Sequence, residues 1–193
     1  MRSLEAHGVP AAVLDGWERS CGTELLPVQE RAVRMGVLAG ASLLVCAPTS
    51  SGKTFIGEMA AIHAALTGHK VVYLVPTKAL AEAKYRRFAA HYAPLGLRVA
   101  IATRDRRAGE REIARGGFDL LVAVPEKARS LLADRPALAG DLGAVIADEL
   151  QMLGDPERGP CLELLLGDLR AASADLQIVG LSAVLGRTDE LAE

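Results

Sequence analysis

One stretch constrains this chain more than any other: Ala47-Pro48-Thr49-Ser50-Ser51-Gly52-Lys53-Thr54. It follows the apolar run 42–46, which is typical of a buried strand, and precedes residues 55–66, which lack proline and are rich in helix formers. A strand, a Gly/Ser loop ending in Gly-Lys-Thr and a helix form the context of a phosphate-binding loop. The sequence therefore predicts that backbone N–H groups of the loop and the helix start converge on phosphate oxygens.

Two side chains of this loop have specific predicted roles. Lys53 is expected to reach the β- and γ-phosphates, and the Thr54 hydroxyl is expected to ligate Mg²⁺. The pattern G-x-x-x-x-G-K-[ST] is met except at its first position, where Ala47 replaces glycine. The alternative is an incidental lysine in a Gly/Ser-rich turn, and the strand before and helix after the loop argue against it. The residues predicted to bind nucleotide are Ala47, Pro48, Thr49, Ser50, Ser51, Gly52, Lys53 and Thr54.

The composition narrows the class of protein. The 193 residues are enough for one sizeable domain, and because half are hydrophobic but only 4% aromatic, its core is expected to be aliphatic. A net charge of −2 argues against a wholly basic nucleic-acid binder but permits a local basic face. Three widely spaced cysteines without a C-x-x-C pair indicate reduced thiols rather than a disulfide framework or zinc site. No apolar run reaches membrane-spanning length, so we expect a cytoplasmic protein without a membrane partner.

Strand-like and helix-like segments alternate along the whole chain. This pattern predicts βαβ units, hence an α/β fold with a mostly parallel sheet and helices on both faces. We expect a single domain over 1–193, in which 1–40 is an N-terminal extension. The predicted strands are 42–46, 71–75, 98–103, 119–124, 144–147 and 176–181, and the predicted helices are 27–38, 53–66, 77–92, 126–133 and 161–171. Residues 151–159 are predicted to form a loop, and residues 188–193 to begin a further helix.

Polar residues or prolines follow five of the predicted strands. In doubly wound sheets, functional residues gather at the carboxyl ends of the strands. The first strand runs into the Gly-Lys-Thr loop, and the others run into Pro76-Thr77-Lys78, Pro125-Glu126-Lys127, Asp148-Glu149 and Ser182-Ala183. This coincidence across five strands is a stronger signal than any single motif.

The two carboxylates at 148 and 149 have distinct predicted roles. Asp148 is expected to hold Mg²⁺ opposite Thr54, directly or through water. Glu149 is expected to polarise the water that attacks the γ-phosphate. The alternative is that two acids merely end a strand, and the phosphate loop about 95 residues earlier disfavours it.

Taken together, these motifs resemble the first RecA-like domain of a superfamily-two helicase of the DEAD/DEAH-box kind. The sequence Gly180-Leu181-Ser182-Ala183 most resembles that of the branch containing archaeal repair helicases and exosome-associated RNA helicases. In chain order the resemblance rests on Leu26–Gln29 (Q motif), Ala47–Thr54 (motif I), Pro76–Ala81 (motif Ia), Val124–Lys127 (T-P-E-K), Asp148–Gln151 (DExH box) and Ser182–Val184 (motif III).

The resemblance implies a RecA-like P-loop fold, ATP and Mg²⁺ as cofactors, and ATP hydrolysis that depends on a nucleic-acid strand. The sequences of these motifs favour DNA over RNA as the nucleic acid bound. A second RecA-like motor domain, absent from this chain, is expected to form the other wall of the ATP site. The isolated domain is therefore expected to hydrolyse ATP slowly and not to unwind duplexes.

The resemblance also implies individual residue roles. Gln29 would read the adenine edge, while Gln151 and Ser182 would couple the ATP state to the nucleic-acid groove. Trp17 offers a base-stacking surface, although a lone tryptophan is more often a core residue. The residues implied to contact the phosphates of one strand are Pro76, Thr77, Lys78, Thr103, Pro125, Glu126 and Lys127.

Four residues depart from the family pattern and keep alternatives open. Gln151 replaces a histidine but can still hydrogen-bond toward Ser182. Val184 and Val124 each replace a threonine, and Arg104 replaces a glycine. Gln151 and Val184 support, as an alternative, a nucleotide-dependent nucleic-acid-binding or regulatory module without unwinding activity. A P-loop ATPase of another kind, such as a kinase or transporter motor, would not explain the Q, T-P-E-K and motif III segments together.

Overall fold

The computed structural model of the chain describes residues 1–103 and 109–183, apart from the side chain of Thr49. Six strands form one sheet in the order β1-β6-β5-β2-β4-β3, and all of the pairings are parallel. The predicted α/β class with a parallel sheet is therefore confirmed. The strands are β1 (Leu43–Cys46), β2 (Lys70–Leu74), β3 (Val99–Ala102), β4 (Leu120–Ala123), β5 (Leu142–Asp148) and β6 (Gln177–Ser182).

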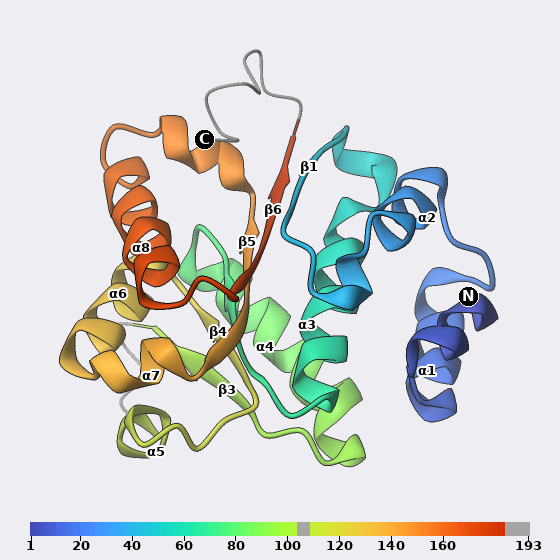
Figure 1. Cartoon of the computed structure of the whole chain (residues 1–193), viewed down its shortest axis with the longest axis horizontal. Helices are drawn as coiled ribbons and strands as arrows, with labels where there is room; N and C mark the ends of the chain where they lie inside the picture. Colours follow the sequence, from blue (N-terminus) through green and yellow to red (C-terminus); the bar gives the residue numbers. More distant parts are fainter. Residues whose placement is uncertain (104–108, 184–193) are drawn as a thin grey trace.

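Helices cover both faces of the sheet (Figure 1). Alternate residues of a strand point to opposite faces, so Val72 of β2 joins one buried cluster and its neighbour Tyr73 joins the other. The cluster containing Tyr73 is covered by α1 (Ala11–Cys21), α2 (Pro27–Arg34), α3 (Lys53–Leu66) and α4 (Lys78–Tyr92). The cluster containing Val72 is covered by α5 (Glu110–Ala114), α6 (Pro125–Asp134), α7 (Pro136–Gly140) and α8 (Gly159–Ala172).

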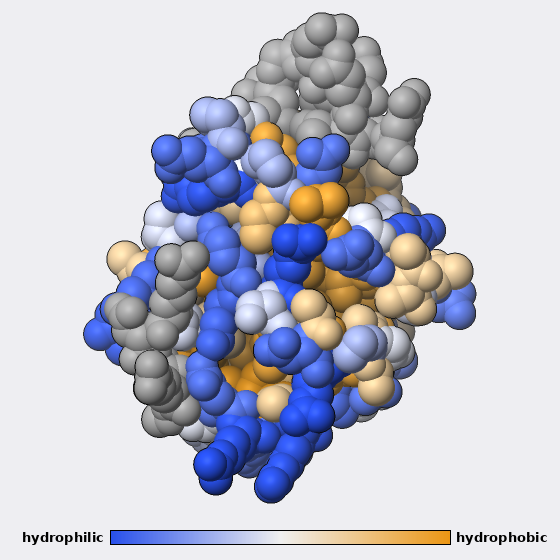
Figure 2. Space-filling view, turned by 90° about the vertical axis from the view of Figure 1, so that its left-hand side faces the viewer, coloured by the Kyte–Doolittle hydropathy of each residue, from blue (hydrophilic) through white to orange (hydrophobic). Residues whose placement is uncertain are grey.

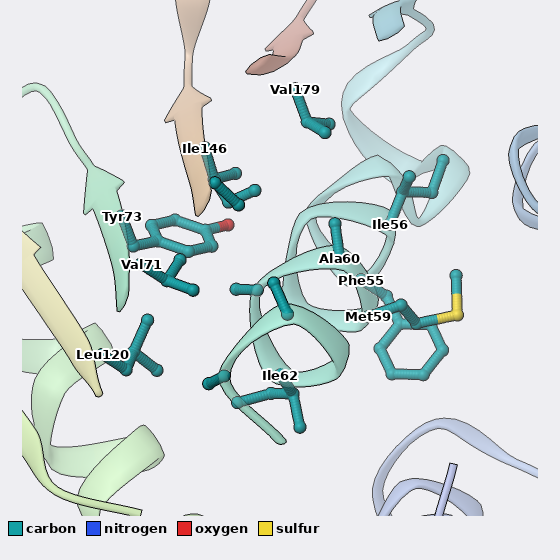
Figure 3. Close-up of a cluster of buried hydrophobic side chains, with 14 of the residues drawn as sticks. Phe55, Ile56, Met59, Ala60, Ile62, Val71, Tyr73, Leu120, Ile146 and Val179 are labelled. Carbon is teal, nitrogen blue, oxygen red and sulfur yellow. The ribbon is translucent and has the colours of Figure 1, made fainter. Parts of the chain in front are cut away.

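Helix α3, which follows the phosphate loop, is enclosed on two sides (Figure 3). One side packs on the sheet through Gly57, where a Cβ would stand only 2.7 Å from Leu181 Cδ1 and 2.8 Å from Ile146 Cγ2. The other side carries Phe55, whose ring meets Trp17 of α1 edge-to-face at a centroid distance of 5.3 Å. Glycine at 57 thus lets α3 lie close to the strands that carry the predicted site.

The N-terminal residues are packed into this same core. The Met1 ammonium donates to the Thr23 carbonyl at 2.8 Å, and the buried Trp17 indole donates to Tyr92 Oη at 2.7 Å. Tyr92 in turn donates to Glu58 of α3, and burial together with the Glu58 charge raises the pKa of the Tyr92 phenol. Trp17 is therefore a core residue, and its indole is not available to stack on a base.

Several boundaries differ from the sequence prediction. Helix α2 ends at Arg34 rather than near 38, because Gly36 adopts a left-handed φ of 88° and a 3-10 helix, Val37–Ala39, follows. Helix α7 was not predicted, and the expected loop 151–159 begins with a 3-10 helix, Leu150–Gly154. The helix anticipated at 188–193 lies outside the described residues, as do Arg104 and Val184.

On the side of the molecule where α6 and α8 lie, the outer surface carries mainly polar side chains, with apolar patches between them (Figure 2). A groove of about 600 Å³ between α6, α7 and α8 is lined in part by Leu132, Cys161 and Leu165. None of the residues predicted to bind nucleotide lines it. All three cysteines are unpaired, as predicted. No helix in the described ranges is long and apolar enough to cross a bilayer.

Candidate nucleotide and nucleic-acid site

The order of the sheet sorts the predicted site residues into two groups along one edge. Because every strand is parallel to its neighbours, all six carboxyl ends lie at the same edge (Figure 1). The adjacent strands β1, β6 and β5 end at the residues predicted for ATP and coupling, namely Ala47–Thr54, Ser182 and Asp148. The adjacent strands β2, β4 and β3 end at the residues predicted for nucleic acid, namely Pro76–Lys78, Pro125–Lys127 and Thr103.

The phosphate loop is a tight turn leading into an uncapped helix. A 3-10 turn, Thr49–Ser51, is followed by Gly52 with a left-handed φ of 81°, and no side chain caps the start of α3. A Cβ on Gly52 would stand 2.5 Å from Gln29 Nε2, so glycine is required there for space as well as for φ. The uncapped helix start leaves N–H groups and the positive end of the helix dipole available to an anion.

The Lys53 ammonium is the most unusual charge in the molecule. The residue is only 1% exposed, yet no hydrogen-bond or ion-pair partner reaches it within the ranges 1–103 and 109–183. In the same loop the Ser51 hydroxyl is also buried without a partner. Among the described residues only Ser51 and Thr103 have a fully enclosed side-chain oxygen or nitrogen without a partner, so the end of the Lys53 side chain keeps some contact with solvent. A ligand with several anionic oxygens would satisfy both groups at once.

Gln29 ties α2 to the phosphate loop. Its Oε1 accepts a hydrogen bond from the Leu26 N–H at 2.8 Å, and its Nε2 donates to the Gly52 carbonyl at 3.1 Å. The amide retains a second N–H and a second lone pair. The adenine contact expected of Gln29 stays a prediction, and what is present is a direct link between the Q-motif helix and the loop.

Asp148, at the end of β5, is held by three donors. Its Oδ2 accepts from the Tyr73 hydroxyl at 3.0 Å and from Lys84 Nζ at 3.2 Å, and its Oδ1 accepts from the Glu149 N–H at 3.2 Å. Burial, with the Asp148 charge adding to it, raises the pKa of the Tyr73 phenol well above its ordinary range. The phenol is therefore a constant donor that fixes the orientation of this carboxylate.

The Mg²⁺ site expected at this edge stays a prediction, and the residue types predicted for it suit that ion. Asp148 and the Thr54 hydroxyl offer hard oxygen ligands. Among the described residues no cluster of three or more His, Cys, Asp or Glu side chains forms a complete metal cage. Magnesium commonly takes one or two protein oxygens and completes its shell with water and substrate phosphates. Asp148 and Thr54 are therefore the residues that would hold such an ion.

Glu149 has a strained backbone conformation. Its φ is 58°, the only positive φ of a non-glycine residue in the part of the chain that the structure describes. A left-handed conformation costs a residue with a Cβ roughly 1–2 kcal/mol, and such strain concentrates at functional positions. The Glu149 Oε2 accepts a hydrogen bond from Gln151 Nε2, so the backbone of Glu149 is strained and its carboxylate is held in a fixed orientation.

Gln151 joins the ends of β5 and β6. Its Oε1 accepts from the Ser182 hydroxyl at 3.1 Å and from the Ala183 N–H at 3.1 Å, while its Nε2 donates to Glu149. The hydrogen bond between Gln151 and Ser182 expected from the sequence is present. A glutamine thus supplies both a donor and an acceptor where the family has a histidine, and the coupling role of this pair stays a prediction.

The nucleic-acid half of the edge consists mainly of helix starts. Thr77 caps α4 by accepting from the Leu80 N–H at 3.3 Å, and both Thr77 and Lys78 are exposed. Pro125 begins α6 and is buried, and Val124 before it provides no side-chain cap. Lys127 pairs with Glu110 of α5.

Not every residue of this half is presented to solvent. Thr103 is buried, and its hydroxyl has no partner within the described ranges. The Arg158 guanidinium, which the sequence did not single out, donates to the Pro76 carbonyl at 3.4 Å and pairs with Asp155. The charge and hydrogen bonds of Arg158 lower the pKa of the Asp155 carboxyl, the largest cause being the Arg158 backbone N–H. Lys84 and Tyr73, which hold Asp148, were likewise missed.

Residues 26–191 match the model of the DEAD/DEAH box helicase family. The chain belongs to the DEAD/DEAH box helicase family. Its relatives include the ATP-dependent DNA helicase Hel308 of Methanocella arvoryzae, 41% identical over 189 residues that make up 96% of this chain and 25% of that protein. Hel308 of Pyrobaculum calidifontis is 42% identical over 175 residues, which are 91% of this chain and 24% of that protein. This helicase-family chain thus spans about a quarter of the length of these curated relatives.

Solved structures share the fold at lower sequence identity. The DUF1998 helicase MrfA bound to DNA superposes with a TM-score of 0.78 and 20% identity, over 96% of this chain and 28% of that one. The same helicase bound to DNA and AMPPNP gives a TM-score of 0.79 at 20% identity, over 96% of this chain and 27% of that one. The fold is therefore that of a RecA-like helicase domain, as the sequence motifs predicted.

Proposed function

We propose that this chain is the first motor domain of a superfamily-two helicase, which binds MgATP and hydrolyses it in response to a nucleic-acid strand. The observation that carries the proposal is Lys53 in an uncapped loop-to-helix turn: its side chain is almost entirely enclosed, and its ammonium has no partner among the described residues. The γ-phosphate of ATP supplies the negative charge that this position lacks. Two of the relatives are ATP-dependent DNA helicases, which favours ATP as the nucleotide and DNA as the strand.

The residues at the edge divide the work of hydrolysis. Lys53 and the loop N–H groups bind the phosphates, and Asp148 and Thr54 hold the metal ion. The Mg²⁺ that Asp148 and Thr54 would hold would supply positive charge against the phosphates. Glu149 orients the attacking water and accepts its proton at the carboxylate, and Gln151 keeps that carboxylate in place.

The second partner is a single nucleic-acid strand, which binds through its sugar-phosphate backbone at the carboxyl ends of β2, β4 and β3. Thr77, Lys78 and Lys127 are the polar contacts we assign there, at helix starts suited to phosphate oxygens. Pro76 and Glu126 shape the same surface, whereas Thr103 and Pro125 are buried beside it. A second RecA-like domain forms the other wall of the ATP site. The unpaired cysteines suit the reducing environment of the cytoplasm, where we place the protein.

A regulatory module without motor activity is the competing interpretation. It drew support from the replacement of histidine by Gln151, but Gln151 still links Glu149 to Ser182. The hydrogen bonds from Glu149 through Gln151 to Ser182 connect the ends of β5 and β6, and this connection favours a working motor.

The test is the ATPase rate of the protein with single-stranded DNA, with single-stranded RNA and with neither. The proposal expects stimulation by a strand, larger with DNA than with RNA, and a low rate for the isolated 193-residue chain. Equal rates under all three conditions would contradict the motor function. Robust duplex unwinding by the isolated chain would contradict the need for a second domain.

A further inference from the structure

Lys84 connects the helix that starts at the nucleic-acid edge to the carboxylate that would hold the metal. Its Nζ lies 3.2 Å from Asp148 Oδ2 and 3.1 Å from the Tyr73 hydroxyl, and 4.4 Å from the centroid of the Tyr73 ring. The Lys84 side chain is 12% exposed and that of Asp148 is 7% exposed. This is a partly buried ion pair with a cation–π contact, so Asp148 and Tyr73 together define the position of the ammonium.

The position of Lys84 on α4 gives this contact its interest. Helix α4 starts at Lys78, immediately after its cap Thr77, and both residues are proposed to contact the nucleic-acid strand. Lys84 lies six positions further on, which is about 9 Å along the helix axis at 1.5 Å per residue. A helix transmits displacement over so short a distance as a rigid body, so α4 cannot shift at its start without moving the Lys84 ammonium.

The next turn of α4 is attached to the nucleotide half as well. Arg87 Nη2 donates to Glu58 Oε2 at 2.7 Å, and Glu58 is a buried carboxylate of α3, the helix that follows the phosphate loop. Successive turns of α4 therefore reach β5 through Lys84 and α3 through Arg87. Only the Lys84 contact touches a residue assigned to the metal.

The pair also leaves the carboxylate usable. Lys84 and Tyr73 both bind Oδ2, whereas among the described residues Oδ1 accepts only the Glu149 N–H. A carboxylate held by one oxygen has its other oxygen in a fixed direction, which lowers the entropy lost when a ligand binds there. A nucleic-acid strand that holds α4 in this position would therefore favour the binding of metal and nucleotide.

We propose that Lys84 is a positioning residue that couples strand binding at the start of α4 to MgATP binding at Asp148. The inference rests on the proposed function and adds the route of communication to it. A strand that holds α4 fixes Lys84, Lys84 fixes Asp148, and the affinity for Mg²⁺-nucleotide rises. By linkage, Mg²⁺-nucleotide tightens strand binding by the same factor.

The test is a set of dissociation constants for AMPPNP, measured by calorimetry in Mg²⁺, with and without a single-stranded oligodeoxythymidine. In the wild-type chain the strand should lower the dissociation constant by about fivefold or more. In Lys84→Met the ratio should fall to within about twofold of one. Lys84→Arg should recover most of it, because the charge returns. In EDTA, Lys84→Met and the wild type should bind AMPPNP alike.

Arg86→Met is the matched control, because it removes an exposed cation from the same helix. Its ratio should equal that of the wild type. The coupling is overturned if Lys84→Met keeps the wild-type ratio, or if Arg86→Met lowers the ratio as much as Lys84→Met does. If Lys84→Met does not fold, Lys84→Gln, which keeps a donor without the charge, should show a reduced ratio.

Failure of the broader proposal has its own signature. If the wild-type chain binds AMPPNP no better than Lys53→Ala does, nucleotide binding itself fails and the coupling falls with it. If the wild type binds AMPPNP well but the strand does not change its affinity, nucleotide binding stands and the coupling through Lys84 is wrong.

Discussion

The Ser182 hydroxyl donates a hydrogen bond of 3.1 Å to Oε1 of Gln151, and this contact joins the ends of the neighbouring strands β6 and β5. Ser182→Ala should leave the affinity for MgATP unchanged and slow strand-stimulated hydrolysis by about fivefold, because a neutral hydrogen bond contributes about 1 kcal/mol. Steady-state ATPase assays would measure it, with the exposed Ser20→Ala as control. An unchanged stimulated rate in Ser182→Ala would exclude this contact from the coupling.

The roles assigned to Lys53 and Glu149 separate binding from turnover. Lys53→Ala should weaken nucleotide binding by at least about tenfold, because a hydrogen bond to a charged group contributes about 1.5–3 kcal/mol. Glu149→Gln keeps the size of the side chain, so binding should persist while hydrolysis falls by about 100-fold or more. The exposed Glu157→Gln serves as the control. Normal hydrolysis by Glu149→Gln would refute its assignment as the base.

The carboxyl-edge arrangement could be predicted from the sequence because each part of it is local. Apolar runs mark the strands, and polar residues or prolines directly after them mark the edge. Parallel pairing then brings these residues together without further information. The phosphate loop and the pair Asp148-Glu149 were accessible in this way, whereas the contact between Gln151 and Ser182 was expected from the family resemblance.

The support of Asp148 could not be predicted because it depends on which strands are neighbours. Tyr73 reaches Asp148 only because β2 lies beside β5, although the two residues are 75 positions apart. Lys84 could not be distinguished from Lys78 or Arg86 on the same predicted helix. Similarly, Gln29 was assigned to adenine from its motif alone, and its link to Gly52 requires the packed position of α2.

The buried network at the N-terminus should contribute strongly to stability. Tyr92→Phe removes the acceptor of the Trp17 indole and a donor to Glu58, both buried. The free energy of unfolding should fall by about 1–3 kcal/mol, the cost of leaving buried polar groups unpaired. Urea denaturation would measure it. A double-mutant cycle with Trp17→Phe should give a non-zero coupling energy, and strict additivity would contradict the network.

The pair Arg98–Asp119 predicts a dependence of stability on pH. The Arg98 guanidinium, 2.6 Å away, lowers the pKa of the Asp119 carboxyl below its ordinary value of 3.8. Since the folded-state pKa is the lower one, this stabilisation is present above about pH 3.8 and is lost as the pH falls through the folded-state value. Asp119→Asn should be less stable than the wild type at pH 7, and the difference should shrink below pH 3.8. The exposed Asp141→Asn is the control, and a constant difference would contradict the pairing.

Two glycines in helices predict opposite effects of the same substitution. At Gly57 a Cβ would stand 2.7 Å from Leu181 Cδ1 and 2.8 Å from Ile146 Cγ2, whereas at Gly16 in α1 nothing lies within 4 Å. Gly57→Ala should therefore lower the free energy of unfolding by about 1–3 kcal/mol through overpacking, because α3 must move off the sheet. Gly16→Ala should raise it by about 0.5–1 kcal/mol, since alanine restricts the unfolded chain and favours the helix. Chemical denaturation compares the two variants directly, and equal effects would show that α3 does not depend on this close approach.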